Sequence, residues 1–181
     1  MTDKSKKTVI LGVTGGIAAY KSPTVCRSLA AAGCDVRVVM TRNACKIISP
    51  HALAAVSGNP VSTNLFPRGE AGMRHISLSK DCDLLLVAPA TANIIGKFAH
   101  GIADDLLSTV FISTDSPKVI APAMNFVMYA NPIVQRNIAL LKEIGVVVIE
   151  PEEGPMADGR EGLGRMPAPE KIAEVALKIM A

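Results

Sequence analysis

A single carboxamide in the segment VIAPAMNFVMYANP (119–132) is the first residue whose position suggests ligand chemistry. A buried strand is predicted to stop at Pro122, and Asn125 follows just beyond its end. Open α/β folds bind their ligands at the carboxyl edge of a parallel sheet. Asn125 is therefore a candidate ligand-binding residue, and its small apolar neighbours and methionines would help to exclude water.

A glycine turn offers a second candidate site. The stretch LGVTGGIAAYK places Gly15 and Gly16 between the first predicted strand and the first predicted helix. Such glycines permit close backbone approach to an anion, although a tight turn needs glycine in any case. The second strand ends in TRN (41–43) instead of the Asp or Glu that binds an adenosine ribose. Hydroxyl, guanidinium and amide groups suit a terminal phosphate, which favours a mononucleotide such as FMN over NAD.

A third polar segment follows the next predicted strand. Pro89 ends this strand, and Thr91 and Asn93 then stand beside Ala90 and Ala92. The small side chains would let a flat ring lie close to the backbone. Thr91 or Asn93 could instead cap the following helix, and the residues alone leave both interpretations open.

The elements that must position these residues alternate between strands and helices. Nearly all-apolar, β-branched segments predict parallel strands buried on both faces, at Thr8–Val13, Asp35–Thr41, Asp83–Ala88, Lys118–Ala121 and Val146–Glu150. Helices are predicted between and after them, at Ile17–Ala32, Ser49–Ser57, Ala92–Ala99, Asp104–Ser113, Pro132–Ile144 and Pro169–Met180. This alternation predicts βαβ units and a three-layer α/β/α, Rossmann-like (flavodoxin-like) sandwich with a central parallel sheet.

Length and composition favour one domain over residues 1–181. We expect an α/β core at 7–150, a loop at 151–166 and a C-terminal helix at 167–181. Two segments do not fit the alternation of elements. NPVSTNLFPRGEAG (59–72) is predicted to be a surface excursion, and the Gly-rich EEGPMADGREGLGR (152–165) a mobile loop.

Charge and composition argue against several classes of partner. The net charge of +3 is scattered, and with 3% aromatic residues and no Trp there is little to stack against nucleic-acid bases. The four cysteines lack the spacing of a metal site, so we expect no metal and predict reduced, buried thiols. Glycines interrupt the first apolar segment before it reaches transmembrane length, so we expect a cytoplasmic protein without a membrane partner.

Four motifs occur in the order and spacing of a known family: GGIAAYK (15–21), MRHISLS (73–79), APATANIIGKFAHGIADDLLST (88–109) and APAMNFVMYANP (121–132). Over residues 7–169 the chain resembles the homo-oligomeric flavin-containing cysteine decarboxylases, most closely the branch that acts on phosphopantothenoylcysteine in coenzyme A synthesis. The resemblance implies trimers, often assembled into dodecamers, with sites at subunit contacts. It implies an FMN site formed by Gly15, Gly16, Ile17, Thr41, Arg42, Asn43, Thr91, Ala92, Asn93, Ile94 and Ala123.

The resemblance also assigns the chemistry. Flavin oxidation of the cysteine gives a thioaldehyde, which accepts the electrons as CO2 leaves and gives an enethiolate. His75 is the implied catalytic base, because an imidazole exchanges protons near pH 7. Asn125 is implied to hold the substrate carboxylate. Met128, and less firmly Lys80, are candidate substrate contacts, although core packing and a solvated lysine explain them as well.

Asp158 departs from the family pattern. Relatives of the phosphopantothenoylcysteine branch carry a Cys there, in a substrate clamp, as the acid for the final reduction of the enethiolate. An exposed Asp is ionised near pH 7, so it must be desolvated to serve as that acid. Otherwise the reaction stops at an enethiol, as in oxidative peptidyl-cysteine decarboxylases, or the fold serves a non-decarboxylating electron-transfer or regulatory role. Asp158 on a tolerant loop surface is a further alternative.

Overall fold

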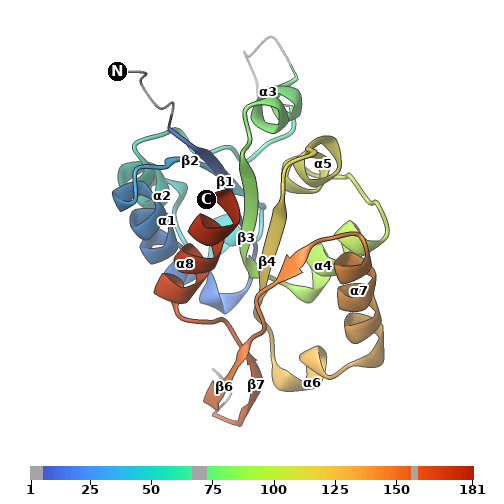
Figure 1. The fold of residues 1–181 in the computed structure, drawn as a ribbon. Coiled ribbons are helices and arrows are strands. Elements are labelled where there is room, and N and C mark those ends of the chain that lie inside the picture. The colour runs from blue at the N-terminus through green and yellow to red at the C-terminus, as the bar shows by residue number, and fades with distance from the viewer. Residues whose placement is uncertain (1–5, 67–72, 156–158) are drawn as a thin grey trace.

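The computed structural model describes residues 6–66, 73–155 and 159–181, and its centre is a parallel sheet (Figure 1). The five strands follow the order β2-β1-β3-β4-β5. They are β1 (Thr8–Val13), β2 (Asp35–Met40), β3 (Leu84–Ala90), β4 (Lys118–Pro122) and β5 (Val147–Val148). This order is flavodoxin-like, so the predicted sandwich is confirmed. In such a sheet the strand order reverses between β1 and β3, which is where ligands bind.

Helices cover both faces of the sheet (Figure 1). The helical elements are η1 (Ile17–Lys21, a 3-10 helix), α1 (Ser22–Ala31), η2 (Ala44–Lys46, a 3-10 helix), α2 (Pro50–Ser57), α3 (Arg74–Lys80), α4 (Ala92–Ala99), α5 (Leu106–Ser113), α6 (Phe126–Tyr129), α7 (Pro132–Glu143) and α8 (Pro169–Met180). α1, α2 and α8 pack together on one face, and α4, α5 and α7 on the other.

Alternate residues of each inner strand enter two different cores. In β3, Leu84 and Leu86 belong to the core beneath α1 and α8, whereas Leu85 and Val87 belong to the core beneath α4 and α5. All four side chains are completely buried. Because burying such a side chain contributes about 2 kcal/mol, both faces of the strand must be apolar, which explains its unbroken apolar run.

Several helical boundaries differ from those predicted. The first predicted helix is two elements, η1 and α1, since Pro23 lies in the first turn of α1 and fixes a new helix start there. Two short helices, α3 and α6, were not predicted. In α3 only Leu78 and Ser79 are buried, and α6 has a single turn, so neither has a long apolar period to reveal it.

The prediction of a mobile loop at 152–165 was wrong for its described residues. β6 (Glu152–Pro155) and β7 (Glu161–Arg165) form an antiparallel hairpin. Glycines in both strands removed the side-chain alternation that identifies strands. The predicted excursion at 59–72 also has structure at its start, where Ser62 is buried and bridges to Val39 at the edge of β2. Residues 67–72 lie outside the described ranges.

Two buried hydroxyl groups compensate for an irregular end of β3. The pairing between β3 and β4 changes register between Val87 and Ala90. In this stretch the Ser22 hydroxyl donates to the Ala88 carbonyl at 2.9 Å, and the Thr14 hydroxyl donates to the Pro89 carbonyl at 2.7 Å. The Thr14 oxygen also accepts from the Thr91 N–H at 3.1 Å. Thr14 thus joins the end of β1 to the start of α4.

The cysteines are free thiols, but only Cys26 and Cys82 are buried, whereas Cys34 and Cys45 are partly exposed, so the prediction of buried thiols is correct for two of the four. Burial raises the pKa of the Cys26 thiol to about 11, so it stays protonated at neutral pH. No helix within the described ranges is both long and apolar enough to cross a bilayer. Nor do those ranges contain a group of three or more His, Cys, Asp or Glu side chains placed to hold a metal ion.

We predict that Thr14→Val will destabilise the protein by about 1–3 kcal/mol, because it removes the partner of the buried Pro89 carbonyl and of the partly buried Thr91 N–H. Thr14→Ser, which keeps the hydroxyl, is the matched control and should lose much less. Urea denaturation followed by circular dichroism measures both. Equal stability of the Val and Ser variants would contradict this account of Thr14.

Candidate functional site

A cavity of about 650 Å³ opens at the carboxyl edge of the sheet, within the size range of small-molecule sites. The turn after β1, the ends of β3 and β4, and the β6–β7 hairpin contribute to its walls. Its lining residues are Gly15, Gly16, Ile17, Ala18, Tyr20, Lys21, Thr91, Ala92, Ala123, Met124, Asn125, Met128, Pro155, Gly164, Arg165 and Met166. The cavity therefore lies where the reversal of strand order predicts a ligand.

The glycine turn packs tightly against the end of β2. A Cβ atom on Gly15 would lie 2.4 Å from the Asn43 Cβ and 2.9 Å from the Asn43 carbonyl carbon. Only glycine allows this approach, because one of the clashing atoms belongs to the backbone. The turn and the TRN segment (41–43) thus form one corner, as the sequence predicted, although only the turn lines the cavity.

The start of α4 forms the next wall, and both interpretations of Thr91 prove compatible. Its side chain accepts from the Ile94 N–H at 3.4 Å and caps the helix, while Thr91 and Ala92 line the cavity. Two other predicted residues do not line it. Asn93 is exposed on the helix, and Ile94 is buried in the core between α4 and α5.

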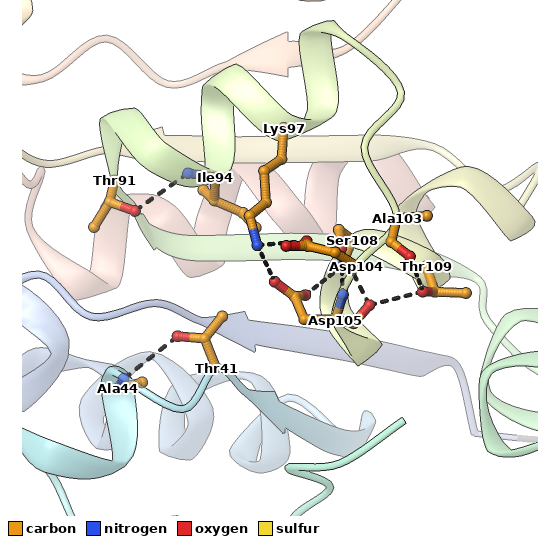
Figure 2. A network of polar contacts seen from close by, with 10 residues as sticks. All are labelled: Thr41, Ala44, Thr91, Ile94, Lys97, Ala103, Asp104, Asp105, Ser108 and Thr109. Atoms are coloured by element: carbon orange, nitrogen blue, oxygen red, sulfur yellow. Dashed lines mark hydrogen bonds and ion pairs between the residues drawn. The ribbon is translucent and has the colours of Figure 1, made fainter. Parts of the chain in front are cut away.

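An ion-pair network fixes α4 against α5, as Figure 2 shows. The Lys97 amine contacts Asp104 Oδ1 at 2.5 Å and Asp105 Oδ2 at 2.7 Å. Asp105 also caps α5 by accepting from the Ser108 N–H at 2.8 Å. The Lys97 side chain is 17% exposed and that of Asp105 31%, whereas Asp104 is 60% exposed, so the contact with Asp105 is the better shielded from water. Lys97, Asp104 and Asp105 of the KFAHGIADD segment thus have a structural role in holding α4 and α5 together.

Asn125 stands at the start of α6, at the cavity wall. Its Oδ1 accepts from the Val127 N–H at 2.8 Å, which caps the helix. Because the oxygen of the amide is used in this cap, the nitrogen Nδ2 is the atom that could donate to a ligand. α6 is in turn fixed by Tyr129, whose hydroxyl donates to Glu150 at 2.7 Å. Burial and Glu150 raise the pKa of Tyr129 to about 12, so the hydroxyl keeps its proton.

The β6–β7 hairpin closes the cavity and docks on α6. The Met124 N–H donates to the Gly164 carbonyl at 2.9 Å, which links the hairpin to the segment after β4. A Cβ atom on Gly162 would lie 2.7 Å from Phe126, so glycine permits this close packing. The Arg160 guanidinium lies 4.9 Å from the centre of the Phe126 ring, a cation–π contact.

The charged residues that line the cavity are both cations. Lys21 is half-buried at the end of η1, and Arg165 is exposed at the end of β7. Burial and the Arg165 guanidinium lower the pKa of Lys21, and Glu152 opposes this effect. No Asp or Glu appears among the described residues that line the cavity. The site therefore favours an anionic ligand.

Within one subunit, His75 lies far from this cavity. It belongs to α3, which leads into the amino end of β3, whereas Asn125 follows the carboxyl end of β4. Figure 1 shows α3 and α6 at opposite ends of the molecule. Lys80, at the end of α3, is also remote from the cavity. Asp158 lies outside the described residues, so its role stays a prediction.

Sequence reasoning missed several cavity residues, because their side chains lack an obvious chemical signature. Thr14 positions Thr91 by accepting a hydrogen bond from its N–H. Tyr20, Pro155 and Met166 line the cavity walls. Lys21 and Arg165 were also missed as lining residues. Both stand in quoted motifs: Lys21 ends GGIAAYK, one short helix after the glycine turn, and Arg165 directly follows the GLG run. Cations so close to glycine-rich segments are the signal that could have identified them.

Comparisons with known proteins show the family and the fold of this chain. The family model described as "Flavoprotein" matches residues 1–180. The chain is 44% identical over 178 residues to the coenzyme A biosynthesis bifunctional protein CoaBC of Bacillus subtilis, and 46% identical over 172 residues to that of Escherichia coli K12. These matches cover 98% and 94% of this chain but only 44% and 42% of the relatives. The chain thus spans less than half the length of these relatives.

Two solved structures are similar over almost their whole length. A mutant PPC decarboxylase complexed with pantothenoylaminoethenethiol has a TM-score of 0.85 at 29% identity, covering 96% of this chain and 97% of that chain. The FMN-dependent cysteine decarboxylase SpaF has a TM-score of 0.83 at 33% identity, covering 98% of this chain and 99% of that chain. The fold around the cavity is therefore one that both types of protein share.

We predict that Gly162→Ala will displace the hairpin from α6, because the added methyl group would overlap Phe126. Substrate affinity should fall by about 10-fold or more, while the melting temperature changes little, since the hairpin lies outside both cores. Glu161→Ala, on the same strand but exposed, is the control and should behave like the parent protein. Limited proteolysis of the hairpin and steady-state KM report the effect, and unchanged values of both for Gly162→Ala would refute it.

Proposed function

Because this chain belongs to the Flavoprotein family, we propose that it is an FMN-dependent decarboxylase of a terminal cysteine carboxylate, of the phosphopantothenoylcysteine type. The observation that carries the proposal is the cavity at the strand-order reversal, which joins the glycine turn to Asn125. Similarity to both CoaBC proteins and cysteine decarboxylases supports it. Residues 1–181 would act as one flavoprotein domain, and a cytoplasmic location is part of the proposal.

The residues at the cavity fit a flavin mononucleotide. The Gly15–Asn43 contact places the TRN segment (41–43) next to the glycine turn, so a phosphate bound at the turn would lie near these polar side chains. Gly16 leaves room for a planar ring, because a Cβ atom there would already lie 3.3 Å from the Thr91 methyl group. Ala92 and Ala123 line the same space without long side chains.

The chemistry that FMN supplies when bound is hydride acceptance from the cysteine β-carbon, which leaves a thioaldehyde that takes up the electrons released with CO2. Asn125 would orient the departing carboxylate by donating from its amide nitrogen. As a neutral donor it does not hold the carboxylate charge as strongly as an arginine would. Met124 and Met128 would limit the access of water to this end of the cavity.

We propose that His75 reaches the site from a neighbouring subunit of a homo-oligomer. Apolar side chains are exposed beside His75 on α3 and α5, at Met73, Ile76 and Ile112, and again at the cavity mouth, at Ile17, Val127 and Met128. Two different apolar patches on one chain suit a heterologous contact that closes into a ring, such as a trimer. The buried His75 Nδ1 has no hydrogen-bond partner in the described part of the chain, so no such bond there fixes the ring tautomer.

A second candidate activity is favoured by one residue, Asp158. If this carboxylate cannot return a proton, the product is the enethiol, as expected for an oxidative peptidyl-cysteine decarboxylase. Otherwise the reaction ends with the fully reduced thiol. Both candidates share the cavity, the flavin and Asn125, so they differ in the substrate and in the final reduction.

The activity predicts a product of defined mass. Incubation of the flavin-loaded protein with phosphopantothenoylcysteine should give a product that has lost CO2 alone, measured by mass spectrometry. A product that has lost CO2 and two further hydrogens would instead favour the oxidative reaction. A protein that takes up no FMN, as judged by its absorbance spectrum after reconstitution, would contradict the proposed function.

The shared site predicts complementation between inactive variants. His75→Asn and Asn125→Asp should each reduce kcat by about 100-fold or more, since proton transfer and carboxylate orientation are each lost. In co-expressed mixed oligomers, about a quarter of the sites should contain an intact His75 from one subunit and an intact Asn125 from another, if subunits assort randomly.

Activity of the co-purified mixture, carrying two different affinity tags, measures this outcome. Mixing the two separately purified proteins without subunit exchange is the control and should stay inactive. Mixed oligomers without recovered activity would show that both residues act within one subunit.

A further inference from the structure

We propose that Lys21 and Arg165 form the receptor for a phosphate monoester at the end of the substrate remote from its cysteine. This inference rests on the proposed function and deepens it, because it concerns the substrate that the same cavity takes. A phosphate receptor would select a phosphorylated small molecule over an unmodified peptide ending in cysteine.

The two cations belong to segments that the fold brings together. Lys21 ends η1, Arg165 ends β7, and the Lys21 amine contacts the carbonyl of Met166, the residue after Arg165, at 3.5 Å. Both line the same cavity as Asn125. One substrate could therefore contact the amide with its carboxylate and the cations with its other end.

Neither cation is neutralised within the part of the chain that the structure describes. Glu152 stands opposite Arg165 in the hairpin register, but its carboxylate pairs with Lys171 at 3.7 Å and does not line the cavity. Burial lowers the pKa of Lys21, and repulsion by the Arg165 guanidinium lowers it further. A dianionic phosphate bound by both would remove this repulsion and gain charge-assisted hydrogen bonds.

The phosphate of the cofactor is a second possible source of the same chemistry. The structure favours the substrate, because the two ends of η1 face different elements. Gly15, just before η1, packs on Asn43 at the end of β2, whereas Lys21, at its other end, contacts the residue after β7. The proposed cofactor-phosphate position at the Gly15–Asn43 corner is thus separate from the cations, which lie beside the hairpin.

The test compares phosphorylated with unphosphorylated ligands at fixed ionic strength. Isothermal titration of the flavin-loaded protein with 4′-phosphopantothenate and with pantothenate gives the phosphate preference without any turnover. The parent protein should bind the phosphorylated ligand about 10- to 100-fold more tightly. In Lys21→Gln/Arg165→Gln this preference should fall close to one.

The double variant Arg27→Gln/Lys178→Gln is the matched control. It removes the same net charge from two exposed residues on α1 and α8 that do not line the cavity, and it should keep the preference. Fluorescence titration with FMN and with riboflavin forms the second arm. The ratio of their affinities should be the same in the Lys21/Arg165 variant as in the parent, because the cofactor phosphate binds elsewhere.

Three results would overturn the proposal: no phosphate preference in the parent, a preference that survives in the Lys21/Arg165 variant, or a selective loss of FMN relative to riboflavin. The last result would assign the cations to the cofactor. These outcomes are separate from failure of the proposed function. A protein that binds 4′-phosphopantothenate through Lys21 and Arg165 but decarboxylates no cysteine would retain the receptor and lose the activity.

Discussion

The reversal of strand order between β1 and β3 is the constraint on which the site depends. Parallel pairing brings the carboxyl ends of all five strands to one edge of the sheet. The crossover connections after β1 and β3 leave toward opposite faces, so their first residues separate and leave a space between them. The glycine turn and Thr91 flank this space, and the end of β4 adds Asn125 beside it. The cavity is thus a consequence of topology before any side chain is considered.

The local sequence then has to make that edge stable. Where the register of β3 changes, two backbone carbonyls are met by the hydroxyls of Ser22 and Thr14, and both hydroxyl-bearing residues are almost completely buried. At Gly15 and at Gly162 a single methyl group would overlap a neighbouring segment. These requirements belong to close approaches between segments distant in sequence. They explain why small and hydroxyl residues gather at this edge without invoking a direct role in chemistry.

Much of the fold could be predicted because fully buried parallel strands need nearly unbroken apolar runs, and β1, β3 and β4 have them. The edge strand β2 is interrupted by Arg37 but remains rich in valine. The hairpin could not be predicted, since its glycines carry no side chains to alternate, and α6 could not, since a single helical turn shows no apolar period.

Several of the predicted site residues follow strands or turns, and the structure gathers them at one cavity: Gly15, Gly16, Thr91, Ala92, Ala123, Asn125 and Met128. Sequence analysis missed Lys21 and Arg165, because they come together only when the hairpin packs beside η1. The separation of His75 and Asn125 within one subunit could not be predicted from the motifs, because the order of motifs along a chain does not show whether they come together in the same subunit.

The polar groups of the cavity divide into two physical kinds. Thr91 and Asn125 have short side chains whose oxygens already bind a backbone N–H, so each is held in one orientation. Groups fixed in this way lose little entropy when a ligand binds, and they suit the end of the substrate where geometry decides the rate. Lys21 and Arg165 have long, charged side chains, which would suit a distant end of the substrate where attraction matters more than angle. Helix capping, which the sequence leaves open as an alternative to ligand binding for Thr91, is therefore compatible with it, because the same hydrogen bonds that cap the helices would hold Thr91 and Asn125 in place for a ligand.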